Sequence, residues 1–188
     1  MPQHNWVSAI HEGGHVLGAR LAGSEIYEAT IVPSKSFDGW VKTDTFSHRE
    51  EGMVEALLGH AAELEFGLRY SWGAEHDYAK VEKTLKERIR WRKSKAWAKA
   101  NDQGETAIIS DSEIHPRSRW DAKTGRRVNL VNDWRKAVRV SRKEWKLEFD
   151  RLRRKARRLA RKHRAYIEKV ATLLVEKCTV TDEEIPQL

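Results

Sequence analysis

The chain has 188 residues, of which 39% are hydrophobic and 34% are charged, and its formal net charge is +8. This length fits one domain, or one domain with an appendage, around a modest core. The single cysteine, Cys178, excludes an intrachain disulfide. The first residues lack the basic and apolar regions of a signal peptide, and no apolar run approaches the ~20 residues of a membrane span, so we expect a cytoplasmic protein without a transmembrane segment.

The first predicted helix, residues 2–22, carries the motif His-Glu-x-x-His from His11 to His15. Two histidines four residues apart project from one face of a helix, and this spacing suits two nitrogen ligands of one tetrahedral zinc ion. Glu12 lies beside them, where a carboxylate can take a proton from the attacking water without ligating the metal. The motif therefore predicts a Zn²⁺ cofactor, with Glu12 as the general base. The competing interpretation is an ordinary helix with two surface histidines.

Two features of this helix argue against a merely solvated helix. Apolar residues recur at helical spacing, which would bury it; they are Val7, Ile10, Val16, Leu17 and Leu21. A glycine destabilises a helix by about 1 kcal/mol relative to alanine, and this helix contains three, at Gly13, Gly14 and Gly18. Glycine is an advantage only where a neighbouring element or a substrate approaches the backbone closely. For Gly13→Ala alone we expect tolerance or a mild gain in stability.

Two short strands are predicted next, at residues 25–32 and 39–43, as a ribbon beside the site. A strand with a free edge could bind an extended peptide by backbone pairing. A ribbon that only packs is an equally good interpretation.

Two helices follow, at residues 50–66 and 74–100, and Asp77 lies at the start of the second. An acidic residue in this place could simply favour the helix N-terminus. It could also be a third zinc ligand, because two histidines leave a catalytic zinc one protein ligand short. His76 is the rival ligand.

Three motifs in this order resemble the peptidase domain of FtsH-type AAA zinc metalloproteases. His-Glu-Gly-Gly-His at residues 11–15 resembles the family's His-Glu-Ala-Gly-His, and residues 59–67 resemble its Gly-Arg-Ala-Ala-Glu-Glu helix, which ends in Phe-Gly. Gly-Ala-Glu-His-Asp at residues 73–77 is similar to its Gly-Ala-Ser-Asn-Asp. The resemblance covers residues 5–85 and 165–186.

The resemblance implies a mainly α fold with a small β-ribbon, of the α+β class: a zincin-like helical metallopeptidase domain of the FtsH-peptidase type. It implies His11, His15 and Asp77 as zinc ligands and Glu12 as the general base. His60 stands where the family has arginine and Leu64 where it has a second glutamate, so the surroundings of the metal can differ. Candidates for these surroundings are Glu63, His60 and His76, although for His60 a structural or surface role is the leading interpretation.

Residues 88–164 have no counterpart in the family. A polar loop is expected over residues 101–127, and then a long helix over residues 129–177, with or without a break. From Trp134 to Lys169 there are sixteen basic and four acidic residues, a net charge of +12, which leaves −4 for the rest. Candidates for binding an anionic partner, whether a nucleic acid, an acidic protein or a membrane surface, are Arg151, Arg153, Arg154, Lys155, Arg157 and Arg158. The competing interpretation is a solvated face over a packed apolar stripe.

We therefore expect a metallopeptidase domain from residues 1–100 and 165–188, with residues 101–164 as an insertion in it. The favoured function is a zinc metalloendopeptidase that cuts unfolded or flexible protein segments. We expect it to be independent of ATP, because the sequence contains no Gly-x-x-x-x-Gly-Lys-Ser/Thr phosphate loop. The family works as hexamers, but its ATPase ring helps to hold them together, so the sequence leaves the oligomeric state open, with a homo-oligomer as one possibility. The alternative function is an inactive, zinc-stabilised module whose basic helix binds nucleic acid or an acidic protein. The presence of Glu12 favours the enzyme, since zinc binding alone does not require it.

Overall fold

The computed structural model describes residues 3–34, 38–44, 49–68, 72–100, 119–121, 126–128 and 136–188. The chain forms two compact units. One consists of residues 1–84 and 147–188, and the other of residues 85–146. The division expected from the sequence, with boundaries at residues 100 and 165, stays a prediction.

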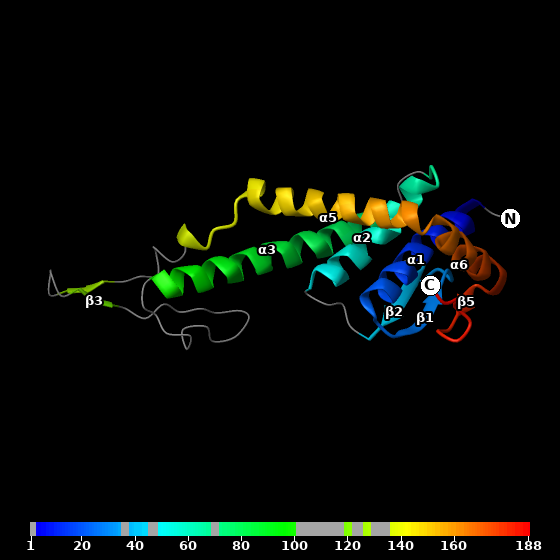
Figure 1. Ribbon diagram of the computed structural model, residues 1–188, viewed down its shortest axis with the longest axis horizontal. Coiled ribbons are helices and arrows are strands. Elements are labelled where there is room, and N and C mark those ends of the chain that lie inside the picture. Colours follow the sequence, from blue (N-terminus) through cyan, green and yellow to red (C-terminus); the bar gives the residue numbers. More distant parts are fainter. Residues whose placement is uncertain are drawn as a thin grey trace. The chain divides into compact units, whose positions relative to one another are not determined.

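The first unit is mainly helical and contains a small antiparallel sheet (Figure 1). This confirms the expected α+β class with a small β-ribbon. Its complete helices are α1 (Gln3–Ala22), α2 (Glu50–Glu65) and α6 (Arg164–Lys177). The start of α3 (Trp72–Ala100) and most of α5 (Arg142–Lys162) also belong to this unit. Among the helices that the structure describes, none is long and apolar enough to cross a bilayer.

Helix α1 packs against both α2 and α6, and its glycines permit this close approach. A Cβ atom on Gly14 would lie 2.4 Å from the carbonyl oxygen of Leu58, on α2. A Cβ on Gly13 would lie 3.1 Å from the carbonyl oxygen of Ile167, on α6. The expectation that a neighbour packs against the glycine face is confirmed. The predicted tolerance of Gly13→Ala now depends on whether α6 can yield by a few tenths of an ångström.

The sheet has the strand order β2-β1-β5, and both pairs are antiparallel. Strands β1 (Ile26–Thr30) and β2 (Trp40–Thr43) are the predicted ribbon, with Ala29 opposite Val41. The third strand, β5 (Thr179–Val180), has only two residues and was not predicted from the sequence. Within the described residues β2 pairs only with β1, so its other edge is free there.

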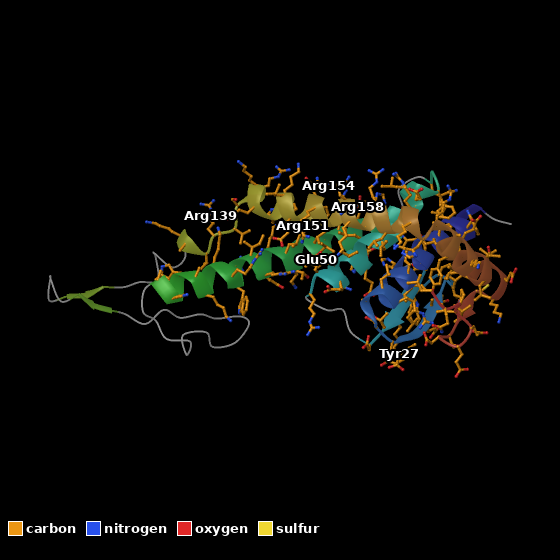
Figure 2. All side chains as sticks on the ribbon, in the orientation of Figure 1. Tyr27, Glu50, Arg139, Arg151, Arg154 and Arg158 are labelled. Atoms are coloured by element: carbon orange, nitrogen blue, oxygen red, sulfur yellow. The ribbon has the colours of Figure 1, made fainter. Side chains whose placement is uncertain are left out.

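Ion pairs join α2 to α5 within the first unit. Glu50, in the first turn of α2, accepts hydrogen bonds from Arg151 at 2.6 Å and from Lys155 at 2.8 Å (Figure 2). Beneath them, α5 buries a row of apolar side chains against the core: Phe149, Leu152, Ala156 and Ala160. The packed apolar stripe expected beneath the basic face is thus confirmed at Phe149, Leu152 and Ala156.

The long helix expected over residues 129–177, with or without a break, is interrupted in the structure. Residues 129–135 lie outside the described part, residues 136 and 137 are helical, residues 138–141 are not, and α5 begins at Arg142. The reason is a capping box: Ser141 donates through its backbone N–H and its hydroxyl to Glu144, at 2.7 Å each, and the N–H of Glu144 donates to the Ser141 hydroxyl at 3.3 Å. A break at His163 then separates α5 from α6.

The second unit contains the remainder of α3 and a short hairpin. Its strands are β3 (Arg119–Asp121) and β4 (Arg126–Val128), which pair antiparallel. The loop expected over residues 101–127 is wrong at these two strands, and the rest of that range lies outside the described residues. The stretch is too polar for strand periodicity to reveal the hairpin.

Candidate metal centre

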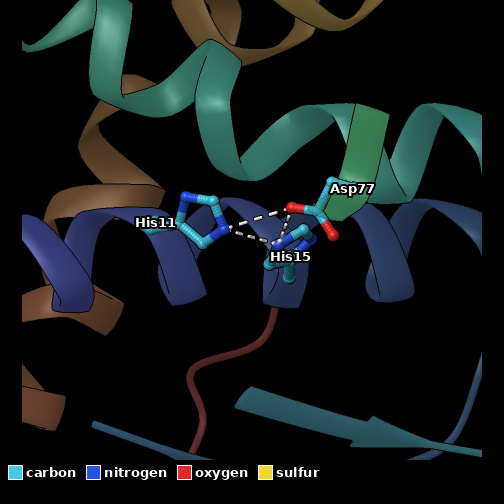
Figure 3. Close-up of side chains that lie close together, drawn as sticks. All are labelled: His11, His15 and Asp77. Atoms are coloured by element: carbon cyan, nitrogen blue, oxygen red, sulfur yellow. Dashed lines mark hydrogen bonds and ion pairs between the residues drawn. The ribbon is translucent and has the colours of Figure 1, made fainter. Parts of the chain in front are cut away.

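Three ligand-type side chains converge where α1 faces the start of α3 (Figure 3). The Nε2 atoms of His11 and His15 lie 3.0 Å apart. Oδ2 of Asp77 lies 3.2 Å from Nε2 of His11 and 3.1 Å from Nε2 of His15. The structure thus brings the three predicted ligands together. The rival ligand His76 is exposed and does not belong to this group.

Hydrogen bonds at Nδ1 of each imidazole determine that Nε2 is the nitrogen that faces the other ligand atoms. Nδ1 of His11 lies 2.6 Å from Oε1 of Glu63, and Nδ1 of His15 lies 3.0 Å from the backbone carbonyl oxygen of Glu55. Both partners are acceptors, so each Nδ1 is the donor and each Nε2 of a neutral ring presents its lone pair to the group. Two lone pairs and a carboxylate oxygen therefore point at one place, which is the arrangement that a cation needs.

The spacing and the donor set fit zinc. Bonds of 2.0–2.2 Å at tetrahedral angles separate two ligand atoms by about 3.3 Å, close to the three separations in this group. Imidazole nitrogens and a carboxylate oxygen are common zinc ligands. The space is also kept open by a glycine: a Cβ on Gly59 would lie 2.6 Å from Nε2 of His15 and 2.7 Å from Nε2 of His11.

The charges around the group favour a positive charge on it. Burial lowers the pKa of His11, but the carboxylates of Asp77 and Glu63 outweigh this and raise it to about 10. Burial likewise lowers the pKa of His15, and the negative charge of Asp77 more than offsets it, so that the pKa is raised. For Asp77, burial raises the pKa, but the two imidazoles hold it well below its usual range. The same carboxylates would stabilise a divalent cation.

Glu12 lies against the group and is buried, with 5% of its surface exposed. Its Oε2 atom has no hydrogen-bond partner in the part of the chain that the structure describes. Burial raises the pKa of Glu12, and the neighbouring imidazoles act in the opposite direction. Gly39, just before β2, borders this carboxylate, because a Cβ there would lie 2.9 Å from Oε1 of Glu12. The ribbon therefore lies beside the site, as expected.

Glu63 connects His11 of the group to a further histidine, His60. It is fully buried; Oε1 accepts from His11, and Oε2 lies 3.2 Å from Nδ1 of His60. His60 is itself buried, at 7% exposure, and its ring makes an edge contact with Tyr78 at 5.3 Å between centroids. This burial fits the structural role expected for His60 and not the surface role, and its place beside Glu63 makes it part of the surroundings of the candidate metal site.

Three contributors to the group were missed by reasoning from the sequence. They are the carbonyl of Glu55 and the glycines Gly39 and Gly59. A backbone carbonyl leaves no signal in the residue type. Gly59 lies in a helix, and its residue type alone gives no sign of a role. In the structure it leaves room for two imidazoles that lie 44 and 48 residues earlier in the chain.

None of the predicted anion-binding residues of α5 belongs to the candidate metal group, and they differ in their surroundings. Arg151 and Lys155 are engaged with Glu50. Arg153 is partly buried, and Arg154, Arg157 and Arg158 are exposed.

No protein-family model matches the chain, and no curated protein matches it either. The resemblance to the FtsH-type peptidase domain therefore stays a prediction, and so do the cytoplasmic location and the homo-oligomer.

Proposed function

We propose that the chain is a zinc metalloendopeptidase with a zincin-like fold of the FtsH-peptidase type. His11, His15 and Asp77 would hold the metal, and Glu12 is the general base. The observation that carries the proposal is the convergence of two oriented Nε2 atoms and one carboxylate oxygen beside a second buried carboxylate, Glu12, which is not one of the three converging groups.

Glu12 distinguishes the enzyme from a module that uses zinc only for stability. Burying a carboxylate with one oxygen unpartnered destabilises a fold, and proteins keep such groups chiefly where they serve a function. A zinc-stabilised module gains nothing from Glu12, whereas a hydrolase requires a base at this position. The unpartnered Oε2 therefore supports the catalytic alternative.

Each residue has a definite part in the reaction. When bound, zinc supplies a Lewis acid that polarises the peptide carbonyl and lets water act as a nucleophile near neutral pH. Glu12 accepts the proton of the attacking water and passes it to the departing amine nitrogen. Glu63 and the carbonyl of Glu55 hold the two imidazoles through their Nδ1 atoms, so that both Nε2 atoms keep their direction.

The ribbon supports a substrate in extended conformation. The outer edge of β2 is free among the described residues, and Gly39 brings this end of the ribbon against Glu12. An extended peptide that paired with this edge would lie near the base and the metal ligands. Folded proteins rarely offer such a strand, which favours unfolded or flexible segments as substrates. Independence of ATP stays a prediction.

The test is cleavage of reduced casein by the zinc-loaded protein, compared with Glu12→Gln. We expect cleavage by the wild type, loss of cleavage with a chelator, and at least a thousandfold slower cleavage by Glu12→Gln with zinc content unchanged. Glu51→Gln, an exposed glutamate on α2, is the matched control and should cut at the wild-type rate. If wild type and Glu12→Gln both hold one zinc and neither cuts, the proposal is wrong.

A further inference from the structure

A row of arginines occupies the outward face of α5. Arg154, Arg157, Arg158 and Arg161 follow one another at steps of three or one and share one face of the helix; this set is called the arginine row below. All four are exposed, and the opposite face of the helix is buried. Arg154 and Arg158 are labelled on α5 in Figure 2. Because the buried face anchors α5, the arginine row is presented on a fixed backbone.

Acidic residues of α2 engage only the margins of this face. Glu50 binds Arg151 and Lys155, and Oε2 of Glu65 lies 3.4 Å from Nε of Arg161. For Arg154, Arg157 and Arg158 the described part of the chain offers no ion-pair partner. Three neighbouring guanidinium groups are therefore left to interact with solvent or a partner, and their mutual repulsion would be relieved by an anion.

We propose that the arginine row binds the phosphate backbone of a nucleic acid. The guanidinium group presents a planar fork of donors that matches phosphate oxygens, and all members of the row are arginine. From Arg154 to Arg161 the helix rises about 10.5 Å, which equals roughly three base-pair steps of 3.4 Å measured along the axis of a duplex. The row can thus follow several successive phosphates.

The composition of this face favours a polyanion over a membrane surface. Every exposed residue of α5 from Arg151 to Lys162 is arginine or lysine. A helix that lies in a bilayer interface needs exposed apolar side chains to enter it, and this segment has none. The face also offers no asparagine, glutamine or aromatic side chain for reading bases. The binding is therefore expected to be independent of sequence.

The test is fluorescence anisotropy with a labelled 30-base-pair DNA duplex, from 50 to 200 mM salt. The variant carries Arg154→Gln, Arg157→Gln and Arg158→Gln. The matched control removes three charges from exposed lysines outside the row, with Lys83→Gln, Lys99→Gln and Lys169→Gln. Circular dichroism and zinc content check that both variants keep the fold.

Three phosphate contacts account for a slope of about 2.7 in a plot of log affinity against log salt. Over this salt range we expect the wild type to lose about 40-fold more affinity than the arginine variant, and the control to keep nearly the wild-type slope. Replacing the three arginines with lysine should preserve most of the slope. Equal losses in the arginine variant and the control would overturn the proposal. So would tighter binding to polyglutamate or to phosphatidylserine vesicles than to DNA at equal salt.

Discussion

Replacement of Gly59 by alanine tests the candidate metal centre through its geometry. The new Cβ would lie 2.6 Å from Nε2 of His15 and 2.7 Å from Nε2 of His11, whereas ordinary contact begins at 3.4 Å. The imidazoles would therefore have to move by about 0.7 Å, more than the ~0.2 Å tolerance of metal–ligand distances. Such a move would also strain the Nδ1 hydrogen bonds to Glu63 and Glu55. We expect zinc affinity to fall by at least about 100-fold.

The fold itself should survive this change. Gly59 lies inside α2, where alanine favours the helix by about 1 kcal/mol. The assay is competition for zinc between the protein and a chromophoric chelator, with helix content followed by circular dichroism. The control is Gly13→Ala, which lies between the two histidines in sequence but directs its Cβ toward Ile167, so its zinc affinity should stay within about threefold of the wild type. Wild-type zinc affinity in Gly59→Ala would refute the assignment of the two Nε2 atoms as ligands.

Further predictions concern the third ligand, the helix contact and an ion pair. Asp77→Asn should weaken zinc binding by about 10- to 100-fold while His76→Ala leaves it unchanged; the reverse result would make His76 the ligand. Gly14→Ala should lower the free energy of unfolding by about 2 kcal/mol in urea titrations, because its Cβ would lie 2.4 Å from a backbone oxygen of α2; a gain in stability would contradict that packing. Hydrogen bonds from α5 lower the pKa of Glu50 to about 2, so its ion pairs stabilise the fold above pH ~4.5 and are lost as the pH falls toward 2. Glu50→Gln should therefore flatten the pH dependence of stability in this window by about 1 kcal/mol, and an unchanged profile would count against the pairing.

The sequence predicted those parts of the fold that depend on local patterns. Helical spacing of apolar residues located α1 and α2, and a ribbon of β-prone residues located β1 and β2. The spacing of His11 and His15 predicted a shared face. Asp77 was one of two candidates for the third ligand, and only the resemblance favoured it over His76, since nothing local separates a ligand from a helix-terminal acid. The start of α5 at Arg142 was not predicted, because one helix was expected to run through Ser141, which instead caps α5.

The parts that were missed depend on distant backbone. Gly59 and Gly39 act by lacking a side chain opposite residues far away in sequence, and the Glu55 carbonyl acts without any side chain. These contributions can be predicted only once the packing of α2 and the ribbon against α1 is known. Strand β5 is a two-residue pairing whose partner, β1, lies about 150 residues earlier in the chain.

The central claim is that one metal ion, held by His11, His15 and Asp77, supports peptide-bond hydrolysis. The most direct measurement is a zinc titration of the metal-free protein in which bound zinc and casein cleavage are followed in the same samples. We predict that cleavage rises in proportion to bound zinc and saturates at one zinc per chain. Cleavage that persists in the metal-free protein, or a full complement of one zinc without cleavage, would contradict the claim.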